Sequence, residues 1–382
     1  MDLDPELLQR IRGRAAGYDR ANAFFEEDLA ELREAGYLRV RPLLETARDQ
    51  RLLAAHAPAT ALAVNMHHVW LGVARVLRDR GDHSLDWVLE DAERGELFAF
   101  GISEPGNDLV LWDSATTAER VPSTPGDRAG SQGGWTFTGT KIFTSLAPAW
   151  TRLGVFGRAE TPEGPRLVHG FLTREDGHDP DGVTTLDDWD TLGMRATQSR
   201  TTVLDGAFIP DERVARILPV GPNPDPFVFG IFANFLLLIG SVYAGIADRA
   251  LELAVEAVQH RASRRTGRSY AQDPDFRWRI ADMALALDAL RPDLESLAAD
   301  VDGRVDHGPD WFRHLTGAKH RATETARSLV DQAARAAGGS GYRSSAELAR
   351  IQRDVLAGIF HPSDTESIHA TVAANLLGPI QD

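Results

Sequence analysis

The sequence predicts an α+β protein that is mainly helical, with one β region between two helical regions. Apolar residues recur near the 3.6-residue period of a helix in two regions, 1–96 and 226–382. Between them, residues 97–213 contain short apolar or alternating runs separated by turn residues, which indicate strands. A single β block in an α–β–α order favours packed α+β layers over repeated βαβ units. We therefore expect an N-terminal helical domain, a central β-domain and a C-terminal helical domain.

The first helical region is marked by Phe24, Leu29, Leu32 and Leu38, which recur near the helical period. Alanine-rich turns follow around residues 53–63. These features predict an N-terminal domain of packed helices.

Strand signals begin after residue 97. Residues 135–138 alternate after two glycines, and 153–157 and 167–172 are short apolar runs. Asp205 and Gly206 mark a turn. This pattern predicts the central β-domain.

The last region contains long stretches rich in alanine, leucine and arginine. Helices are predicted over 246–263, 276–301 and 318–337, and the glycines after residue 337 end the last of them. Residues 227–247 are almost wholly apolar and long enough to cross a membrane. Because three glycines and two polar residues interrupt the run and no second span exists, we expect a helix buried in a bundle or a subunit interface. A proline-rich linker at 221–226 precedes it.

Length and composition narrow the function classes. A chain of 382 residues exceeds the usual size of a single core, and its 43% hydrophobic and 25% charged residues are typical of a soluble globular protein. A formal charge of −15 disfavours nucleic acid or an anionic membrane as the main partner. The absence of cysteine excludes disulfides, thiol catalysis and cysteine-bound metals, and we expect no metal site. The acidic N-terminus lacks signal-peptide features, so a cytoplasmic location is expected.

Four short motifs follow one another along the chain. Ser103-Glu104-Pro105-Gly106 comes first, and the strand-like segment 139–145 comes second. The third covers 192–199 with its Gly-Met-Arg sequence, and the fourth, 338–354, joins a glycine-rich turn to an Arg-Asp pair. In order and spacing these motifs resemble the acyl-CoA dehydrogenase superfamily over roughly residues 100–365. Each motif taken alone could be an ordinary edge strand, loop or surface ion pair.

The resemblance implies a flavin between the β-domain, which is barrel-like in this family, and a C-terminal four-helix bundle, in a homo-oligomer that is a tetramer or a dimer. A flavin ring needs a wall on one face and hydrogen bonds at its edge, which strand backbone and hydroxyl groups supply. The cofactor-binding residues implied by the resemblance are Ser103, Phe143, Thr144, Ser145, Arg195, Thr197, Gly338 and Gly339.

A basic cluster that includes Arg264 and Arg265 follows the helix predicted at 246–263. The family uses an R-x-x-F-G stretch at this place to hold the adenosine diphosphate part of FAD across a subunit boundary. Here Thr266 replaces the phenylalanine and Ser263 replaces the first arginine. Neighbouring arginines still suit phosphate binding, although a solvated helix end explains them equally well. FAD is expected, and FMN stays open.

The position of the family's catalytic glutamate, after the Arg353-Asp354 pair, holds His361, Pro362 and Ser363. A histidine after an RD motif resembles the class D flavin monooxygenases, which share this scaffold. The same relatives carry a histidine that faces the flavin in a helix, where this chain has His67 and His68. Because adjacent helical residues point about 100° apart, only one can face the pocket, and we favour His68.

The leading hypothesis is therefore a monooxygenase that receives reduced flavin from a separate reductase and oxygenates a small molecule. His361, His68 and Ser145 are the expected catalytic residues, since histidine and hydroxyl groups suit oxygen handling in a site without water. One alternative is an acyl-CoA or acyl-carrier-protein thioester dehydrogenase with a displaced carboxylate. A catalytically silent scaffold is the second alternative. The candidate carboxylates are Glu252, Glu256, Asp364 and Glu366.

Overall fold

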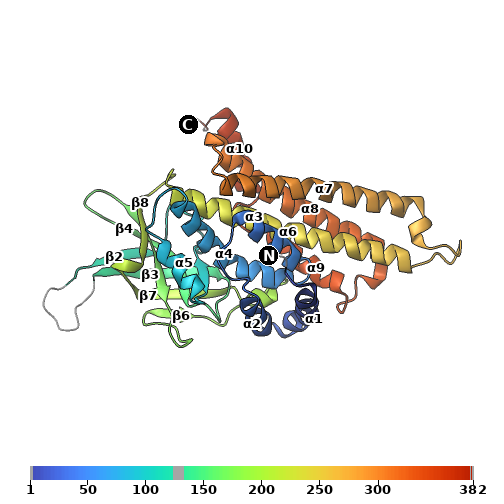
Figure 1. The fold of residues 1–382 in the computed structure, drawn as a ribbon, viewed down its shortest axis with the longest axis horizontal. Helices are drawn as coiled ribbons and strands as arrows, with labels where there is room; N and C mark the ends of the chain where they lie inside the picture. The colour runs from blue at the N-terminus through green and yellow to red at the C-terminus, as the bar shows by residue number, and fades with distance from the viewer. Residues whose placement is uncertain (1–2, 124–132, 379, 381–382) are drawn as a thin grey trace.

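The structure is a computed structural model that describes residues 3–123, 133–378 and 380. Helices at both ends of the chain enclose a central sheet, which confirms the predicted α+β class (Figure 1). The N-terminal helices are α1 (Pro5–Ala21), α2 (Glu26–Glu34), α3 (Leu43–Ala54), α4 (Pro58–Arg78) and α5 (Asp86–Glu93). The C-terminal helices are α6 (Pro226–His260), α7 (Pro274–Asp302), α8 (Trp311–Ala337), α9 (Glu347–Val355) and α10 (Thr365–Leu377).

The β-domain is an eight-stranded sheet with the order β6-β7-β3-β2-β4-β5-β8, and β1 pairs with β4. Its strands are β1 (Phe98–Gly101), β2 (Thr117–Val121), β3 (Gly134–Thr144), β4 (Arg152–Ala159), β5 (Arg166–Thr173), β6 (Val183–Thr185), β7 (Arg200–Pro210) and β8 (Val214–Pro219). Strands β4 and β5 are buried along nearly their whole length, as their apolar sequences predict. The long pair β3 and β7 carries the second and third motifs at one end.

Helix α6 is one continuous helix, whereas the sequence indicated separate stretches at 227–247 and 246–263. Asp225 caps its start by accepting a hydrogen bond from the backbone N–H of Phe227, and Pro226 occupies the first turn. By length and composition α6 could cross a membrane, but 83% of its most apolar window is buried inside the protein. It serves here as the core helix.

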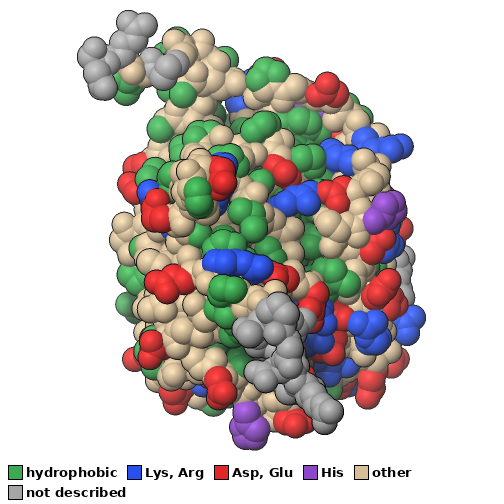
Figure 2. Space-filling view, turned by 90° about the vertical axis from the view of Figure 1, so that its left-hand side faces the viewer, with side chains coloured by type: hydrophobic (Ala, Val, Ile, Leu, Met, Phe, Trp, Pro, Cys, Tyr) green, Lys and Arg blue, Asp and Glu red, His purple; other side chains and the backbone are tan. Residues whose placement is uncertain are grey.

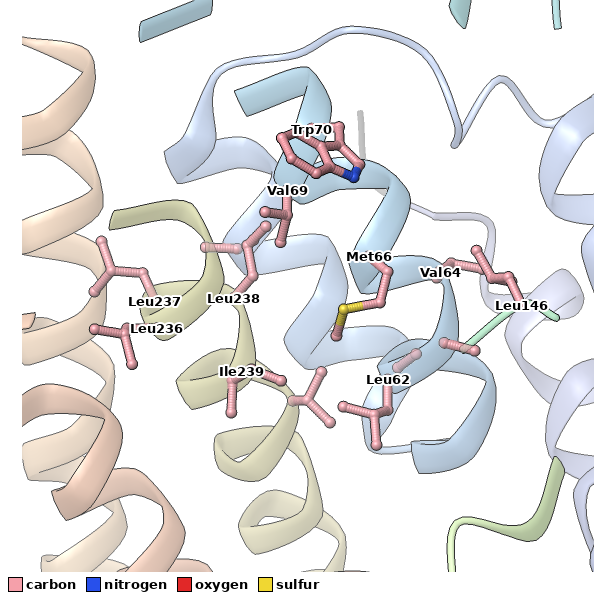
Figure 3. Packing of buried hydrophobic residues seen from close by; sticks show 14 of the residues in the cluster. Leu62, Val64, Met66, Val69, Trp70, Leu146, Leu236, Leu237, Leu238 and Ile239 are labelled. Carbon is pink, nitrogen blue, oxygen red and sulfur yellow. The ribbon is translucent and has the colours of Figure 1, made fainter. Parts of the chain in front are cut away.

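The core joins the two helical regions through α4 and α6, which Figure 3 shows side by side with Val69 and Leu238 facing each other. Gly72 permits this close approach, because a Cβ at that position would overlap the side chain of Asn234. Leu146, which follows β3, belongs to the same core. The end of β3 is therefore fixed against the helices as well as within the sheet.

The long helices α6, α7 and α8 lie together and extend away from the sheet, and α10 projects from them (Figure 1). This arrangement confirms the predicted helical C-terminal domain. The face at the opposite, β-domain end carries interspersed acidic, basic and hydrophobic side chains (Figure 2).

Candidate functional site

Helix α9 holds the loop that carries the third motif. The carboxylate of Asp354 accepts a hydrogen bond of 2.6 Å from the backbone N–H of Met194. Gly193 allows this contact, because a Cβ there would overlap the backbone carbonyl of Arg353. Burial raises the pKa of the Asp354 carboxyl above its usual value, and this effect outweighs the lowering by the Arg350 charge 3.3 Å away. The Arg-Asp pair and the Gly-Met-Arg motif, 160 residues apart in the chain, thus meet through a hydrogen bond from the backbone of one to a side chain of the other.

Arg195 and Arg353 both fasten this loop to helix α1. Arg353 pairs with the Asp19 carboxylate and donates to the carbonyl of Leu192. Arg195 donates to the Asp19 carbonyl at 2.9 Å and to the Asp190 carboxylate at 3.0 Å. The Arg195 guanidinium therefore has structural partners, and its role in cofactor binding stays a prediction.

Two predicted site residues, Ser145 and Thr197, are joined through Ser199. The Ser145 and Ser199 hydroxyl oxygens are 2.7 Å apart, and the same distance separates those of Ser199 and Thr197. Thr197 in turn donates to the carbonyl of Met194 at 2.9 Å. We name Ser145, Ser199 and Thr197 the hydroxyl chain. All three side chains are buried, and Ser199 was not among the residues predicted to form the site.

The remaining residues predicted on β3 lie just before the hydroxyl chain. Phe143 has a left-handed backbone (φ 58°), its side chain is 54% exposed, and its ring meets that of Trp189 edge-on. The backbone N–H of Ile142 donates to the carbonyl of Ser103 at 2.9 Å, which places the first motif beside the second. The Thr144 hydroxyl is buried and has no hydrogen-bond partner among the residues that the structure describes.

A buried ion pair joins the first motif to strand β3. Lys141 donates to Glu104 at 2.6 Å, and Glu104 also accepts from Ser114 and the backbone N–H of Thr116. Burial lowers the pKa of Lys141 to about 8 against the pull of the Glu104 charge. Burial would raise the pKa of Glu104, but Lys141 and the hydroxyl and amide donors lower it to about 2. The pair fixes the Ser103 segment to β3.

His361 lies against α6 rather than among the hydroxyl groups. Its Nε2 is 3.0 Å from the Tyr243 hydroxyl. Burial, with a further contribution from the charge on Lys319, lowers the pKa of His361 to about 3, so the imidazole is neutral near pH 7. Lys319 also donates to the carbonyls of His361 and Ser363, at 2.9 and 2.7 Å. This role of Lys319 could not be predicted from the sequence, because a lysine in a long helix usually lies in solvent.

The two adjacent histidines of α4 have different surroundings. His67 accepts from the backbone N–H of Phe98 through Nδ1, so its Nε2–H donates to the carbonyl of Leu38. His68 is equally buried, but its Nε2 has no partner. A small cavity next to it is lined by Arg39, Arg41, Leu43, Thr46, Leu71, Gly72, Asn234 and Leu238.

Among the described residues, no hydrogen bond or ring contact joins His68 to Ser145 or His361. The three expected catalytic residues are therefore not in mutual contact, and their shared role stays a prediction.

The other predicted cofactor residues lie at the far end of the long helices. Gly338 ends α8 beside Arg261, and Arg264 and Arg265 are exposed in the turn after α6. The eighteen residues of α6 from Tyr243 to His260 span about 26 Å. One chain therefore does not bring Arg264, Arg265, Gly338 and Gly339 to the β3 residues.

The β3 residues fit the ring of a flavin. Phe143 offers an exposed aromatic wall, and the buried Thr144 hydroxyl and Trp189 indole N–H lack partners nearby. Orphaned buried polar atoms of this kind are uncommon unless a ligand or water completes them. When bound, a flavin supplies electron transfer and oxygen chemistry at this place. Within the described residues no group of histidine and carboxylate side chains could hold a metal ion.

Comparisons with known proteins agree with this geometry. Residues 237–363 match the family described as "Acyl-CoA dehydrogenase, C-terminal domain". A putative acyl-CoA dehydrogenase, YdbM, from Bacillus subtilis is 28% identical over 96% of this chain and 94% of its own length. L-evernosamine nitrososynthase from Micromonospora is 28% identical over 94% of this chain and 85% of its own. The solved structure of KijD3 in complex with FMN and an amino-sugar dTDP derivative has a TM-score of 0.82 at 26% identity and covers 99% of this chain and 92% of its own.

The fold and the site define a flavin-dependent oxidoreductase. The chain has the acyl-CoA dehydrogenase fold, and its residues 237–363 match the C-terminal domain of that family. Its relatives include nitrososynthases as well as dehydrogenases, which confirms the similarity to the class D monooxygenase branch expected from the sequence.

Proposed function

We propose that this protein is a monooxygenase that uses reduced flavin and O2 to oxygenate a small organic substrate. The observation that carries the proposal is the identity of the residues at 361–363, which follow the Arg353-Asp354 pair. His361, Pro362 and Ser363 occupy the place of the family's catalytic carboxylate, and His361 is a neutral, half-buried imidazole beside the Tyr243 hydroxyl. A neutral imidazole can donate or accept a hydrogen bond, but it cannot replace a carboxylate that removes a proton next to a thioester.

The nearby carboxylates are engaged elsewhere. Asp364 caps α10 by accepting from the backbone N–H and hydroxyl of Ser367. Glu252 and Glu256 pair with Arg249, and their side chains are 52% and 54% exposed. A general base for a thioester needs a carboxylate removed from water. None of these three groups meets that requirement.

The relatives support the proposal without determining the reaction. One relative is named as a nitrososynthase, and a structural neighbour binds FMN together with an amino-sugar nucleotide. By analogy we propose that a separate reductase supplies the reduced flavin. We also propose a homo-oligomer in the cytoplasm, and we leave FAD and FMN as alternatives.

The test is anaerobic reduction of the flavin-loaded protein followed by rapid mixing with O2. For a monooxygenase we expect two resolved phases in the flavin absorbance, with hydrogen peroxide released only in the second when substrate is absent. A single fast phase with immediate peroxide release would count against the proposal.

Similarity to YdbM favours a dehydrogenase as the second candidate. In that case acyl-CoA thioesters would bleach the oxidised flavin without O2, and Asp364→Asn or Glu366→Gln would abolish the bleaching. A protein that binds neither FAD nor FMN would instead indicate a silent scaffold.

A further inference from the structure

The hydroxyl chain has only one arrangement of protons that makes all of its bonds. Each hydroxyl group has one proton to donate. Thr197 donates its proton to the carbonyl of Met194. Ser199 must then donate to Thr197, and Ser145 must donate to Ser199. The direction of the chain is therefore set at the Met194 carbonyl.

This direction leaves Ser145 with a free hydrogen-bond acceptor and no free donor. Within the described residues Ser199 is the sole hydrogen-bond partner of the Ser145 hydroxyl. Ser145, Thr197 and Ser199 are 5%, 0% and 6% exposed, so bulk water has little access to reverse the order. A buried chain of hydroxyl groups also strengthens each of its bonds by polarisation.

We propose that Ser199 and Thr197 are positioning residues that hold Ser145 as a hydrogen-bond acceptor and thereby make the site prefer reduced over oxidised flavin. Reduced flavin carries a proton on N5, whereas oxidised flavin has a lone pair there. An acceptor hydroxyl at the edge of the ring would therefore complement the reduced form, whereas it would offer no proton to the lone pair of the oxidised form. The inference deepens the proposed function, on which it rests, because a monooxygenase supplied by a reductase begins its cycle by capturing reduced flavin.

The preference can be measured without turnover. Fluorescence titration gives the dissociation constant of oxidised FMN, and anaerobic redox titration gives the midpoint potential of bound FMN relative to free FMN. The two values yield the dissociation constant of the reduced form, because free and bound FMN, each oxidised or reduced, form a closed thermodynamic cycle. We expect the wild-type protein to bind reduced FMN at least tenfold more tightly than oxidised FMN.

Ser199→Ala removes the acceptor that holds the Ser145 proton, so Ser145 becomes free to donate to oxidised FMN. The preference should fall about tenfold, the usual effect of one hydrogen bond, which corresponds to about 30 mV in a two-electron couple. Thr197→Val removes the acceptor for Ser199 and should shift the preference in the same direction. Ser199→Thr keeps the hydroxyl and should retain the preference within about twofold.

Thr202→Val is the matched control, because Thr202 carries a buried hydroxyl on β7 that has no hydrogen-bond partner within the described ranges. It should leave the preference unchanged. The inference would be overturned by a preference that stays within twofold of wild type in folded Ser199→Ala, or by an equal shift in Thr202→Val. If Ser199→Ala does not fold, an unchanged preference in Thr197→Val overturns it.

The outcome is separable from the proposed function. A shift in redox preference with single-phase reoxidation would reject the monooxygenase and keep the positioning role. Two-phase reoxidation with no shift in redox preference would support the monooxygenase and reject the positioning role.

Discussion

Lys319 is a single residue on which the position of the His361 segment depends. Its ammonium group is almost fully buried and donates to the carbonyls of Gly358, His361 and Ser363. The sequence could not predict this role, since the acceptors lie about 40 residues further along the chain and are backbone atoms. The neutral state of His361 also depends partly on this charge.

Lys319→Met tests this role. The three carbonyls lose a charged donor, so the free energy of unfolding should fall by about 1–3 kcal/mol. Removing the positive charge should also raise the pKa of His361. Urea denaturation and histidine NMR titration measure the two effects. Arg327→Met, on the exposed side of α8, should change stability by less than about 0.5 kcal/mol. An unchanged His361 pKa would contradict the electrostatic role.

His169 makes the fold sensitive to acid. It is fully buried between the rings of Phe156 and Phe227, and neither of its ring nitrogens has a hydrogen-bond partner in the described part of the chain. Burial, followed by the charge on Lys141, lowers its pKa to about 3. An unfolded histidine titrates near 6.5. Between these two values the unfolded chain binds a proton that the folded chain does not, so stability falls as the pH falls.

His169→Phe should therefore stabilise the protein by about 1 kcal/mol at pH 7, because two unsatisfied nitrogens leave the core. Between pH 6 and 4 its stability should fall less steeply than that of wild type, by about 1.4 kcal/mol per pH unit. Urea denaturation across this pH range measures both effects. His178→Phe at an exposed position is the control for the added ring. An identical pH slope in His169→Phe and wild type would show that His169 does not titrate as described.

At the scale of elements, the contact between α9 and the 190–199 loop holds the hydroxyl chain in place. Gly193→Ala should separate the two, because its Cβ would overlap the Arg353 carbonyl and break the bond from Met194 to Asp354. We expect a loss of about 2–3 kcal/mol in stability and at least tenfold weaker FMN binding. Gly17→Ala, in open space on α1, should be neutral or slightly stabilising. Unchanged FMN affinity in Gly193→Ala would show that the site does not need this contact.

The elements were easier to predict from the sequence than their boundaries. The strands at 153–157 and 167–172 are present in β4 and β5, because a continuous apolar run suits a strand buried on both faces. Helix α6 was divided in the prediction because its character changes from wholly apolar to amphipathic near residue 247. No proline or helix-ending glycine interrupts it there, so the backbone continues as one helix.

At the scale of the whole molecule, the motifs predicted a common flavin site, and the structure divides their residues into two groups. Ser103, Phe143, Thr144, Ser145 and Thr197 meet at the end of β3. Arg264, Arg265, Gly338 and Gly339 lie at the other end of the long helices. The resemblance implied this separation for Arg264 and Arg265, as residues that act across a subunit boundary, but not for Gly338 and Gly339. Sequence order alone cannot reveal it, because it gives neither the direction of each helix nor the placement of a second copy.

The division leads to a prediction that distinguishes FAD from FMN. FAD and FMN share the ring and the first phosphate, and FAD adds an adenosine phosphate whose charge suits an arginine cluster. Arg264 and Arg265 are exposed beyond the end of α6, about 26 Å along the helix from Tyr243, so they would reach this part of FAD from a neighbouring copy.

Replacing both Arg264 and Arg265 by alanine should then weaken FAD binding at least tenfold in the oligomer and change FMN binding less than twofold. Arg335→Ala removes an exposed charge near the same end of α8, where Arg335 pairs with Asp331, and should affect neither. Flavin titrations at several protein concentrations, with sedimentation to fix the oligomeric state, provide the measurement. Equal affinities for FAD in the double variant and wild type would mean that the cluster is a solvated helix end, and the β3 residues alone would then hold the flavin.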